Sequence, residues 1–315
     1  MRPRLKIFDS DTVNLPDPTV TVLLPVRNGE LWIRECLTSI LNQTSKDFEV
    51  VLIDDGSSDN SVSIALSMNV PQLRVVLGPQ AGLARALALG IESARGEFIA
   101  RQDVDDLSCP ERLETQVRAF REDPSMVLLG SSAIEIDSGG GKIGRLRVPK
   151  SDRSIRLRGT FVNPFIHTSV MFRRSTALAA GNYSSPSSSP YPEDFDLWGR
   201  MLKFGRVRNM TKPLVQYRRT DHGLMAQNAR LIGVAAGQVA CRNVAEILEC
   251  AKLSIGDSQL VSMFHWRSRK ITLVEAARIL ALILRIRLKF GLLPMFQGLP
   301  IRIYLRPIIW LYKTP

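Results

Sequence analysis

Three aspartates crowd one short segment, Asp103-Val104-Asp105-Asp106, which directly follows the apolar run 98–100. Carboxylates this close repel one another, and a divalent cation is the usual partner that neutralises them. Their hard oxygen atoms favour Mg²⁺ or Mn²⁺, and Mg²⁺ is commonly held by one or two carboxylates together with the phosphates of a substrate. The segment therefore indicates a metal site for a diphosphate ligand. The alternative is an acidic loop that caps a helix beginning near Pro110.

A second acidic cluster, Asp54-Asp55, follows another apolar run at 48–53. Both apolar runs have the length and composition of buried strands. The carboxyl ends of parallel strands meet at one edge of a sheet, and the ligands of such sheets bind along that edge. We therefore expect the two acidic clusters to line one polar crevice.

The elements that must position these clusters alternate through the first hundred residues. Strands are expected at 20–26, 48–53, 73–77 and 96–100, with helices at 31–41, after 58–59 and from 82 to 94. This alternation predicts an α/β fold, with a mostly parallel sheet flanked by helices. Further strands are expected at 126–130 and 133–136, followed by a hairpin turn at Ser138-Gly139-Gly140-Gly141.

The composition is that of a globular protein, with 45% hydrophobic and 23% charged residues among 315. The four cysteines show no C-x-x-C spacing, so we expect neither a zinc site nor a disulfide framework, and a reducing cytoplasm fits best. The first residues contain no apolar stretch typical of a signal peptide. The most apolar later stretch, 271–290, is interrupted by five charged residues, so no membrane span is expected.

The last fifth of the chain is strongly basic. From 265 to 315 ten lysines and arginines stand against one glutamate, a net +9 of the +12 carried by the whole chain. Apolar residues punctuated by arginine, with aromatic residues such as Trp310 and Tyr312 beyond them, favour a helix that lies on an anionic membrane surface. A helical subdomain that packs on the rest of the chain shows the same pattern and is the alternative. No nucleic-acid partner is expected, because no recognised binding motif accompanies the charge.

Five motifs occur in the order found in family 2 glycosyltransferases, which the chain resembles from about Val20 to about His222. The motifs are Pro25-Val26-Arg27-Asn28-Gly29-Glu30, Asp54-Asp55-Gly56-Ser57-Ser58-Asp59, Gly82-Leu83-Ala84-Arg85, Asp103-Val104-Asp105-Asp106 and Glu193-Asp194. The resemblance implies a GT-A fold, an inverting mechanism and a nucleotide-diphosphate sugar donor, with UDP favoured and dTDP or GDP left open.

On this basis the chain divides into three parts. An N-terminal extension is expected at 1–17, a GT-A catalytic domain at 18–222 and a helical, basic, membrane-associating region at 223–315. Within the catalytic domain, residues 18–109 would form the nucleotide-binding part and residues 110–222 the acceptor part.

On the donor side, the resemblance assigns Pro25, Arg27 and Glu30 to the nucleotide pocket and Asp55 to the base or ribose. Structural roles stay open, because Pro25 can simply end a strand and Glu30 can stabilise a helix N-terminus. Arg85 lies on the first turn of a helix, where it would reach a phosphate or hold an aspartate unless it is an ordinary surface charge.

In the acidic motif, the resemblance places Asp103 on the ribose side, Asp105 on the metal and Asp106 in support. A bound metal would act as a Lewis acid on the departing nucleoside diphosphate. Relatives often carry a histidine near the metal after a Tyr-Arg pair. Here His222 comes two residues later than that position, so it would be a ligand only if the loop bulges.

On the acceptor side, Glu193-Asp194 matches the family's acidic pair. A sugar hydroxyl is a poor nucleophile, so a carboxylate must accept its proton as the new bond forms. Asp194 is the expected general base and Glu193 the second candidate, although both could merely occupy the first turn of a helix. His167 either faces the acceptor or is a structural histidine, and Trp198 is expected in the core.

The sequence thus predicts an inverting, metal-dependent glycosyltransferase that uses Mn²⁺ or Mg²⁺. It would move a sugar to a glycan or lipid-linked acceptor during cell-surface polysaccharide synthesis of the bacterial type, at the inner face of the plasma membrane. The alternative is a non-catalytic module that binds a nucleotide sugar or polysaccharide on the same scaffold, which would have no use for a base. A nucleotidyltransferase is disfavoured because its glycine-rich N-terminal phosphate loop is absent.

Overall fold

The computed structural model describes residues 7–9, 17–184, 191–220, 224–262 and 273–289. His222 and the basic stretches at 263–272 and 290–315 lie outside the described residues.

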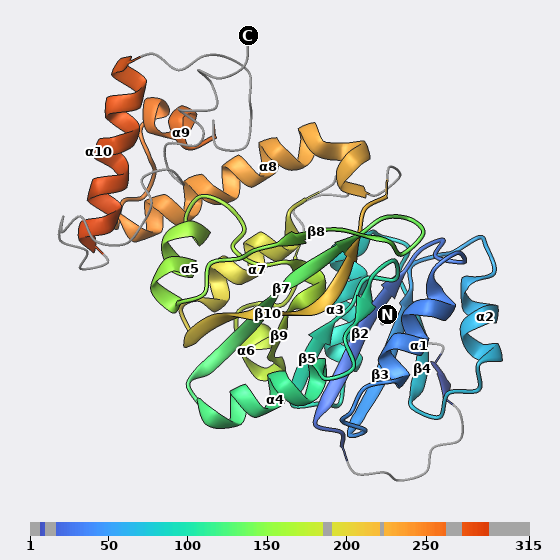
Figure 1. The fold of residues 1–315 in the computed structure, drawn as a ribbon. Coiled ribbons are helices and arrows are strands. Elements are labelled where there is room, and N and C mark those ends of the chain that lie inside the picture. The colour runs from blue at the N-terminus through green and yellow to red at the C-terminus, as the bar shows by residue number, and fades with distance from the viewer. Residues whose placement is uncertain (1–6, 10–16, 185–190, 221–223, 263–272, 290–315) are drawn as a thin grey trace, which may run out of the picture.

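One mixed sheet carries the fold (Figure 1). Its strands run in the order β1, β4, β3, β2, β5, β9, β7, β10, β6, with β8 paired to β7. Strands β4, β3, β2 and β5 are parallel neighbours, and β9 is antiparallel to both β5 and β7. Their bounds are β1 Ile7–Asp9, β2 Val20–Val26, β3 Phe48–Asp54, β4 Leu73–Leu77, β5 Phe98–Arg101, β6 Leu107–Ser108, β7 Met126–Ile136, β8 Lys142–Leu146, β9 Met171–Arg173 and β10 Arg206–Arg218. The α/β fold class is confirmed, with helices flanking a sheet whose central strands are parallel.

The central strands are buried on both faces because their side chains alternate between two cores. In β2, Val22 and Leu24 belong to one core, whereas Leu23 belongs to the other. Helices α1 (Ile33–Leu41), α2 (Ser61–Ser67) and α4 (Arg112–Glu122) cover the first core, and α3 (Leu83–Ser93), α5 (Asp152–Gly159), α6 (Arg174–Ala179) and α7 (Glu193–Met201) cover the second. Such burial explains why 20–26 is apolar at nearly every position.

The connection after β5 places the acidic motif. The chain leaves β5 at Arg101 and reaches β6 at Leu107, which pairs with Gln216 of β10. Residues 102–106 therefore cross from the middle of the sheet to the end of β10. Strand β2 ends opposite β3, with Val26 paired to Asp54, so both acidic clusters lie at the carboxyl edge of the parallel strands.

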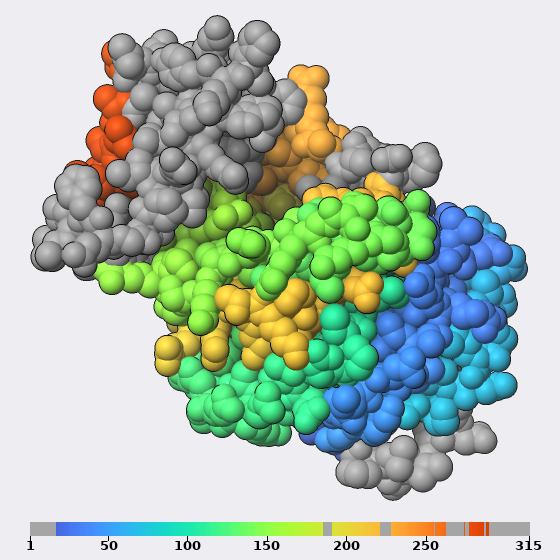
Figure 2. All heavy atoms as spheres, viewed as in Figure 1, coloured from blue at the N-terminus to red at the C-terminus, as the bar shows by residue number. Residues whose placement is uncertain are grey.

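Three helices follow the sheet: α8 (Leu224–Ile247), α9 (Ile255–Ser262) and α10 (Leu273–Lys289). A third core joins them to the rest of the chain, because Phe161 and Phe195 are buried together with Val239 of α8 and Ile283 of α10. Figures 1 and 2 show these orange and red helices at one end of the molecule, away from the blue residues of the N-terminal strands and helices. Among the described residues, no helix combines the length and apolarity needed to span a bilayer.

Candidate active site

The acidic motif gathers three carboxylates after β5. One oxygen each from Asp103, Asp105 and Asp106 lies within 4.8 Å of the others. Burial, and then the neighbouring Asp105, raise the pKa of Asp106 to about 7, and burial also raises the pKa of Asp105. Asp106 Oδ2 is buried and has no hydrogen-bond partner in the described part of the chain. Three crowded carboxylates, one of them with an oxygen that lacks a hydrogen-bond partner among the described residues, fit a hard divalent cation such as Mg²⁺ or Mn²⁺.

The backbone around the motif is held by β10. Arg218, the last residue of β10, donates its backbone N–H to Asp106 Oδ1 at 2.7 Å and its Nε to the Asp105 carbonyl at 2.8 Å. Its guanidinium also pairs with Glu35 at 2.8 Å and stacks on Trp32, with 4.3 Å from the Arg218 Cζ to the ring centroid. These bonds are consistent with the supporting role predicted for Asp106. Asp105, in contrast, is partly exposed.

On the donor side, Asp55 lies where β3 ends and organises the loop before α3. Its two carboxylate oxygens accept from the backbone N–H groups of Ala81, at 3.2 Å, and Gly82, at 2.8 Å. Gly82 has φ +89°, a left-handed conformation that suits glycine, and it precedes the helix whose first turn carries the exposed Arg85. Asp55 thus ties the end of β3 to the loop before α3.

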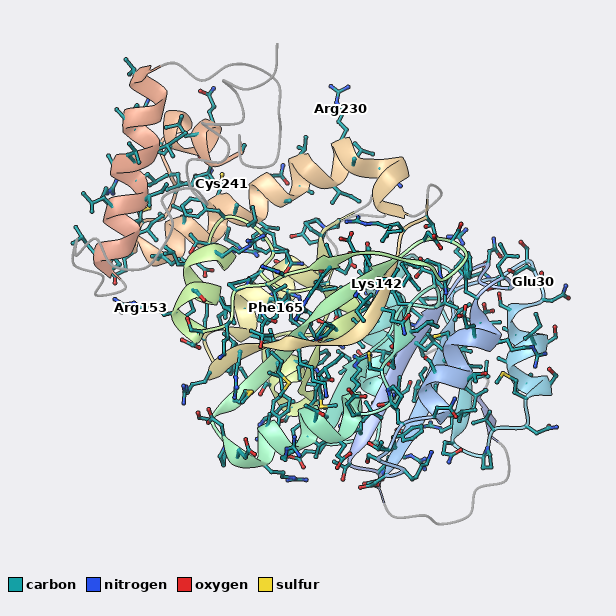
Figure 3. The ribbon with its side chains drawn as sticks, viewed as in Figure 1. Glu30, Lys142, Arg153, Phe165, Arg230 and Cys241 are labelled. Carbon is teal, nitrogen blue, oxygen red and sulfur yellow. The ribbon has the colours of Figure 1, made fainter. Side chains whose placement is uncertain are left out.

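The residues of the motif at 25–30 have different surroundings in the structure. Pro25 is buried inside β2 and Arg27 is exposed just after the strand. Glu30 turns away toward α2, where its carboxylate accepts from the backbone N–H of Asn60 at 3.1 Å and from Asn60 Nδ2 at 3.0 Å (Figure 3). These bonds give Glu30 a structural use at the start of α2, so its assignment to the nucleotide pocket stays a prediction.

The pair predicted for the acceptor side, Glu193 and Asp194, opens helix α7. Asp194 Oδ2 accepts from Asn163 Nδ2 at 2.6 Å, and Asp194 Oδ1 accepts from the Phe195 backbone N–H at 2.7 Å. Burial, followed by the charge of Asp194, raises the pKa of Glu193 to about 8, and burial raises the pKa of Asp194 as well. Two adjacent carboxyl groups with raised pKa values are typical of an acid–base site.

His167 lies against this pair. Its Nδ1 is 3.8 Å from Asp194 Oδ2 and 3.9 Å from Glu193 Oε1, while its Nε2 hydrogen-bonds the Tyr183 hydroxyl at 2.9 Å. Burial, and then the charge of Arg101, hold the pKa of His167 well below its usual value, so the ring is neutral at physiological pH. The structure therefore brings His167 to the predicted acceptor side. It also packs edge-on against Trp198, which is 1% exposed and lies in the core as expected.

Three polar residues of this site escaped the sequence analysis: Arg101, Asn163 and Tyr183. Arg101 ends β5 yet is only 1% exposed, and it ion-pairs with Asp103. An arginine inside an otherwise apolar strand is the one local signal that could have been noticed. Asn163 and Tyr183 carry no comparable signal, since each reaches the site only through the folding of distant segments.

Comparisons with known proteins identify the family of the chain. Residues 21–178 match Glycosyl transferase family 2. The amylovoran biosynthesis glycosyltransferase AmsE of Erwinia amylovora is 34% identical over 190 residues, which cover 59% of this chain and 70% of that protein. EpsE, a candidate glycosyltransferase of Bacillus subtilis, is 32% identical over 206 residues, which cover 64% and 73%. The chain belongs to glycosyl transferase family 2, and it is a glycosyltransferase.

Two solved structures share the fold. S. aureus TarS 1–349, in complex with UDP-GlcNAc, superposes with a TM-score of 0.61 at 20% identity and covers 87% of this chain and 84% of that one. The mannosyltransferase PcManGT from Pyrobaculum calidifontis, in complex with GDP-Man and Mn²⁺, gives 0.55 at 19% identity, covering 94% and 84%. At this identity the likeness concerns the fold alone.

Proposed function

We propose that the protein is an inverting, metal-dependent glycosyltransferase of surface-polysaccharide synthesis, acting on a glycan or lipid-linked acceptor. The observation that carries the proposal is the pairing of two acidic sets around one site. Asp103, Asp105 and Asp106 gather at the end of β5, while Glu193 and Asp194 open α7, and the buried Arg101 is charge-coupled to both sets. One set suits a metal diphosphate and the other suits a proton acceptor.

On the donor side, Asp105 and Asp103 would hold the cation and the donor. When bound, the metal supplies positive charge that stabilises the departing nucleoside diphosphate. Asp106 is tied by the backbone N–H of Arg218, so it would fix the loop that presents Asp105. Asp55 and Arg85 would contact the nucleotide and phosphates from the neighbouring strand end and helix.

On the acceptor side, Asp194 would take the proton of the attacking hydroxyl. Asn163 and the Phe195 N–H fix its two oxygens, which keeps a lone pair in one direction. Glu193, with a pKa of about 8, is the member of the pair that carries a proton at neutral pH. Asp194 would then serve as the base, with the protonated Glu193 beside it.

UDP is the nucleotide that we propose. Support comes from TarS, whose structure contains UDP-GlcNAc, whereas the PcManGT structure contains GDP-Man. The experiment is a panel of UDP, dTDP and GDP sugars, each assayed for hydrolysis and transfer with Mn²⁺, with Mg²⁺ and with a chelator. Metal-dependent turnover of one donor supports the enzyme. Tight binding of a nucleotide sugar without any turnover across the panel would favour the binding-module alternative.

We also propose that the protein associates with anionic membrane at the inner face of the plasma membrane. Helix α10 buries one face, with Ile279, Ile283 and Ile286, in the third core. Its opposite side exposes Leu280, Leu284 and Leu288, at 46–51%, beside the exposed cations Arg278, Arg285 and Lys289. Apolar residues with flanking cations are typical of helices that lie on anionic lipid.

Vesicle flotation tests this proposal. The triple substitution of Leu280, Leu284 and Leu288 by serine keeps the buried face of α10 intact, whereas a protein ending near Lys252 would also uncover the third core. Wild-type protein should float with phosphatidylglycerol vesicles and much less with phosphatidylcholine vesicles, and the triple variant should float less. Equal flotation of the wild type and the triple variant would reject this surface as the membrane contact.

A further inference from the structure

Arg101 is a buried cation whose bonding differs from that of its equally buried neighbour. Arg112 donates Nε to Gln116 at 3.2 Å, Nη1 to Gln102 at 2.8 Å and Nη2 to the Arg101 carbonyl at 2.7 Å, so neutral acceptors satisfy its guanidinium. Arg101 instead ion-pairs with Asp103, and its Nε has no hydrogen-bond partner among the residues that the structure describes. An arginine kept only to tie strands together would be expected to satisfy its donors as Arg112 does.

The charged and titratable groups around Arg101 come from every side of the site. They are Asp103, Asp105 and Asp106 after β5, Glu193 and Asp194 of α7, His167 of the short helix η1 (His167–Ser169), Tyr183 after α6, Arg112 of α4 and Tyr217 of β10. Burial raises the pKa values of Glu193 and Asp194, and the charge of Arg101 opposes that rise in both. Arg101 therefore contacts the first acidic set directly, through its ion pair with Asp103, and acts on the Glu193–Asp194 pair through its charge.

We propose that Arg101 is a positioning residue for glycosyl transfer, which orients Asp103 on the donor side and offsets the charge of the Glu193–Asp194 pair on the acceptor side. The inference rests on the proposed function. Arg101 is 1% exposed, so it acts through these carboxylates and not by touching a substrate. A fixed charge in a water-poor site acts more strongly than the same charge in solvent.

Loss of this cation should affect the reaction more than donor binding. Without Arg101, Asp103 loses the partner that fixes its direction, and the Glu193–Asp194 pair becomes harder to ionise. The nucleotide pocket around Asp55 is built from other segments, so it should remain formed. A purely structural arginine would instead lower stability and leave the pH dependence of the folded enzyme unchanged.

The test uses the full chain with Arg101→Met, Arg101→Lys and the control Arg74→Met. Arg74 pairs with the buried Glu49 at 3.0 Å near the start of β3, which is the opposite edge of the sheet from the acidic motifs. Each variant is measured for kcat and KM with the donor that turns over in the panel, for binding of UDP with Mn²⁺ by calorimetry, for thermal unfolding, and for the pH dependence of kcat.

For Arg101→Met we expect kcat to fall about 100-fold, as small misplacements of reacting groups can cause. Binding of UDP with Mn²⁺ should change much less, and the acidic limb of the pH profile should move upward by about one unit. Arg101→Lys should recover part of both effects, and Arg74→Met should lower stability without moving the limb.

The proposal is overturned if the acidic limb of Arg101→Met stays in place and its loss of kcat matches its loss of folded protein. It is equally overturned if Arg101→Lys folds but shows no recovery of either kcat or the limb. If Arg101→Met does not fold, Arg101→Lys is compared with the wild type instead. A lower kcat with an acidic limb moved upward supports the proposal. An unmoved limb, with a loss of kcat that matches the loss of folded protein, overturns it. Absence of any turnover by the wild-type protein would contradict the proposed function, a result distinct from a change confined to the variants.

Discussion

The side chain of Asn163 donates a 2.6 Å hydrogen bond to Oδ2 of Asp194, the residue to which we assign the acceptor's proton. Asn163 lies in the segment after α5, whereas Asp194 lies in the first turn of α7, so the bond joins two segments 31 residues apart in the sequence. The amide therefore fixes the carboxylate from outside its own helix.

Replacement of Asn163 by alanine should lower kcat by about 10- to 100-fold, because the base loses one of the bonds that orients it. Steady-state transfer assays measure this effect. Asn209→Ala is a suitable control, since Asn209 also donates side-chain amide hydrogen bonds, but to the carbonyls of Pro149 and Pro164. Similar losses of kcat in both variants, relative to the folded fraction, would show that Asn163 has no special effect on Asp194.

Asp105→Asn should reduce kcat by about a thousandfold, because the metal's charge on the leaving diphosphate is worth several kcal/mol. The Mn²⁺ concentration required for half-maximal rate should rise in the same variant. Glu97→Gln is the matched control, since Glu97 precedes the other end of β5 and pairs with Arg121 and Arg173. An Asp105→Asn enzyme with normal rate and normal Mn²⁺ dependence would remove Asp105 from the metal site.

Glu193→Gln should stabilise the metal-free protein at alkaline pH. The pKa of Glu193 is about 8 in the folded protein, against 4.5 for an ordinary glutamate, so the folded state holds the proton more tightly than the unfolded state. Wild-type stability should therefore fall as pH rises from about 4.5 to about 8, then level off. Glutamine removes this ionisation, and the gain should be on the order of 1 kcal/mol or more at pH 8.5.

Urea unfolding at pH 4 and pH 8.5 checks the prediction for Glu193. The difference between Glu193→Gln and wild type should be small at pH 4 and favour the variant at pH 8.5. A variant that is equally destabilised at both values would contradict the raised pKa.

Arg242→Met should weaken the contact between the C-terminal helices and α7, the helix that carries Asp194. Arg242 of α8 ion-pairs with the buried Asp196 of α7, which Arg200 also contacts at 2.9 Å. Loss of a hydrogen-bonded charge pair at a buried carboxylate should lower the free energy of unfolding by on the order of 1 kcal/mol or more. Lys203→Met breaks the more exposed pair with Glu246 and should have little effect. Thermal and urea unfolding would reveal the reverse order if this reasoning is wrong.

Much of the site follows from local sequence. Asp55 and Asp103 to Asp106 lie at strand ends because apolar runs of the right length precede them, and Glu193 with Asp194 opens a helix as their acidic pattern suggests. These motifs carry their own local signal. His167 is positioned by the short helix η1, yet its contact with Tyr183 depends on a segment 16 residues away.

The second half of the sheet was not predictable in the same way. Strand β9 inserts antiparallel between β5 and β7, and the 13-residue strand β10 runs parallel to β7 through register shifts around Pro213. Such pairings join segments far apart in the chain, and a proline within the strand obscures its pattern. Arg101 and Asn163 were missed for a related reason, because their partners become neighbours only when these strands and α7 assemble.

Replacement of Asp194 by asparagine tests the central claim most directly. Asparagine keeps the shape and the bond to the Phe195 N–H but cannot accept a proton, so sugar transfer should fall by several orders of magnitude, about 10²- to 10⁴-fold. Binding of UDP with Mn²⁺, measured by calorimetry on the same preparation, should remain within a few-fold of wild type. Transfer at the full wild-type rate by Asp194→Asn, with donor binding intact, would contradict the assignment of the general base.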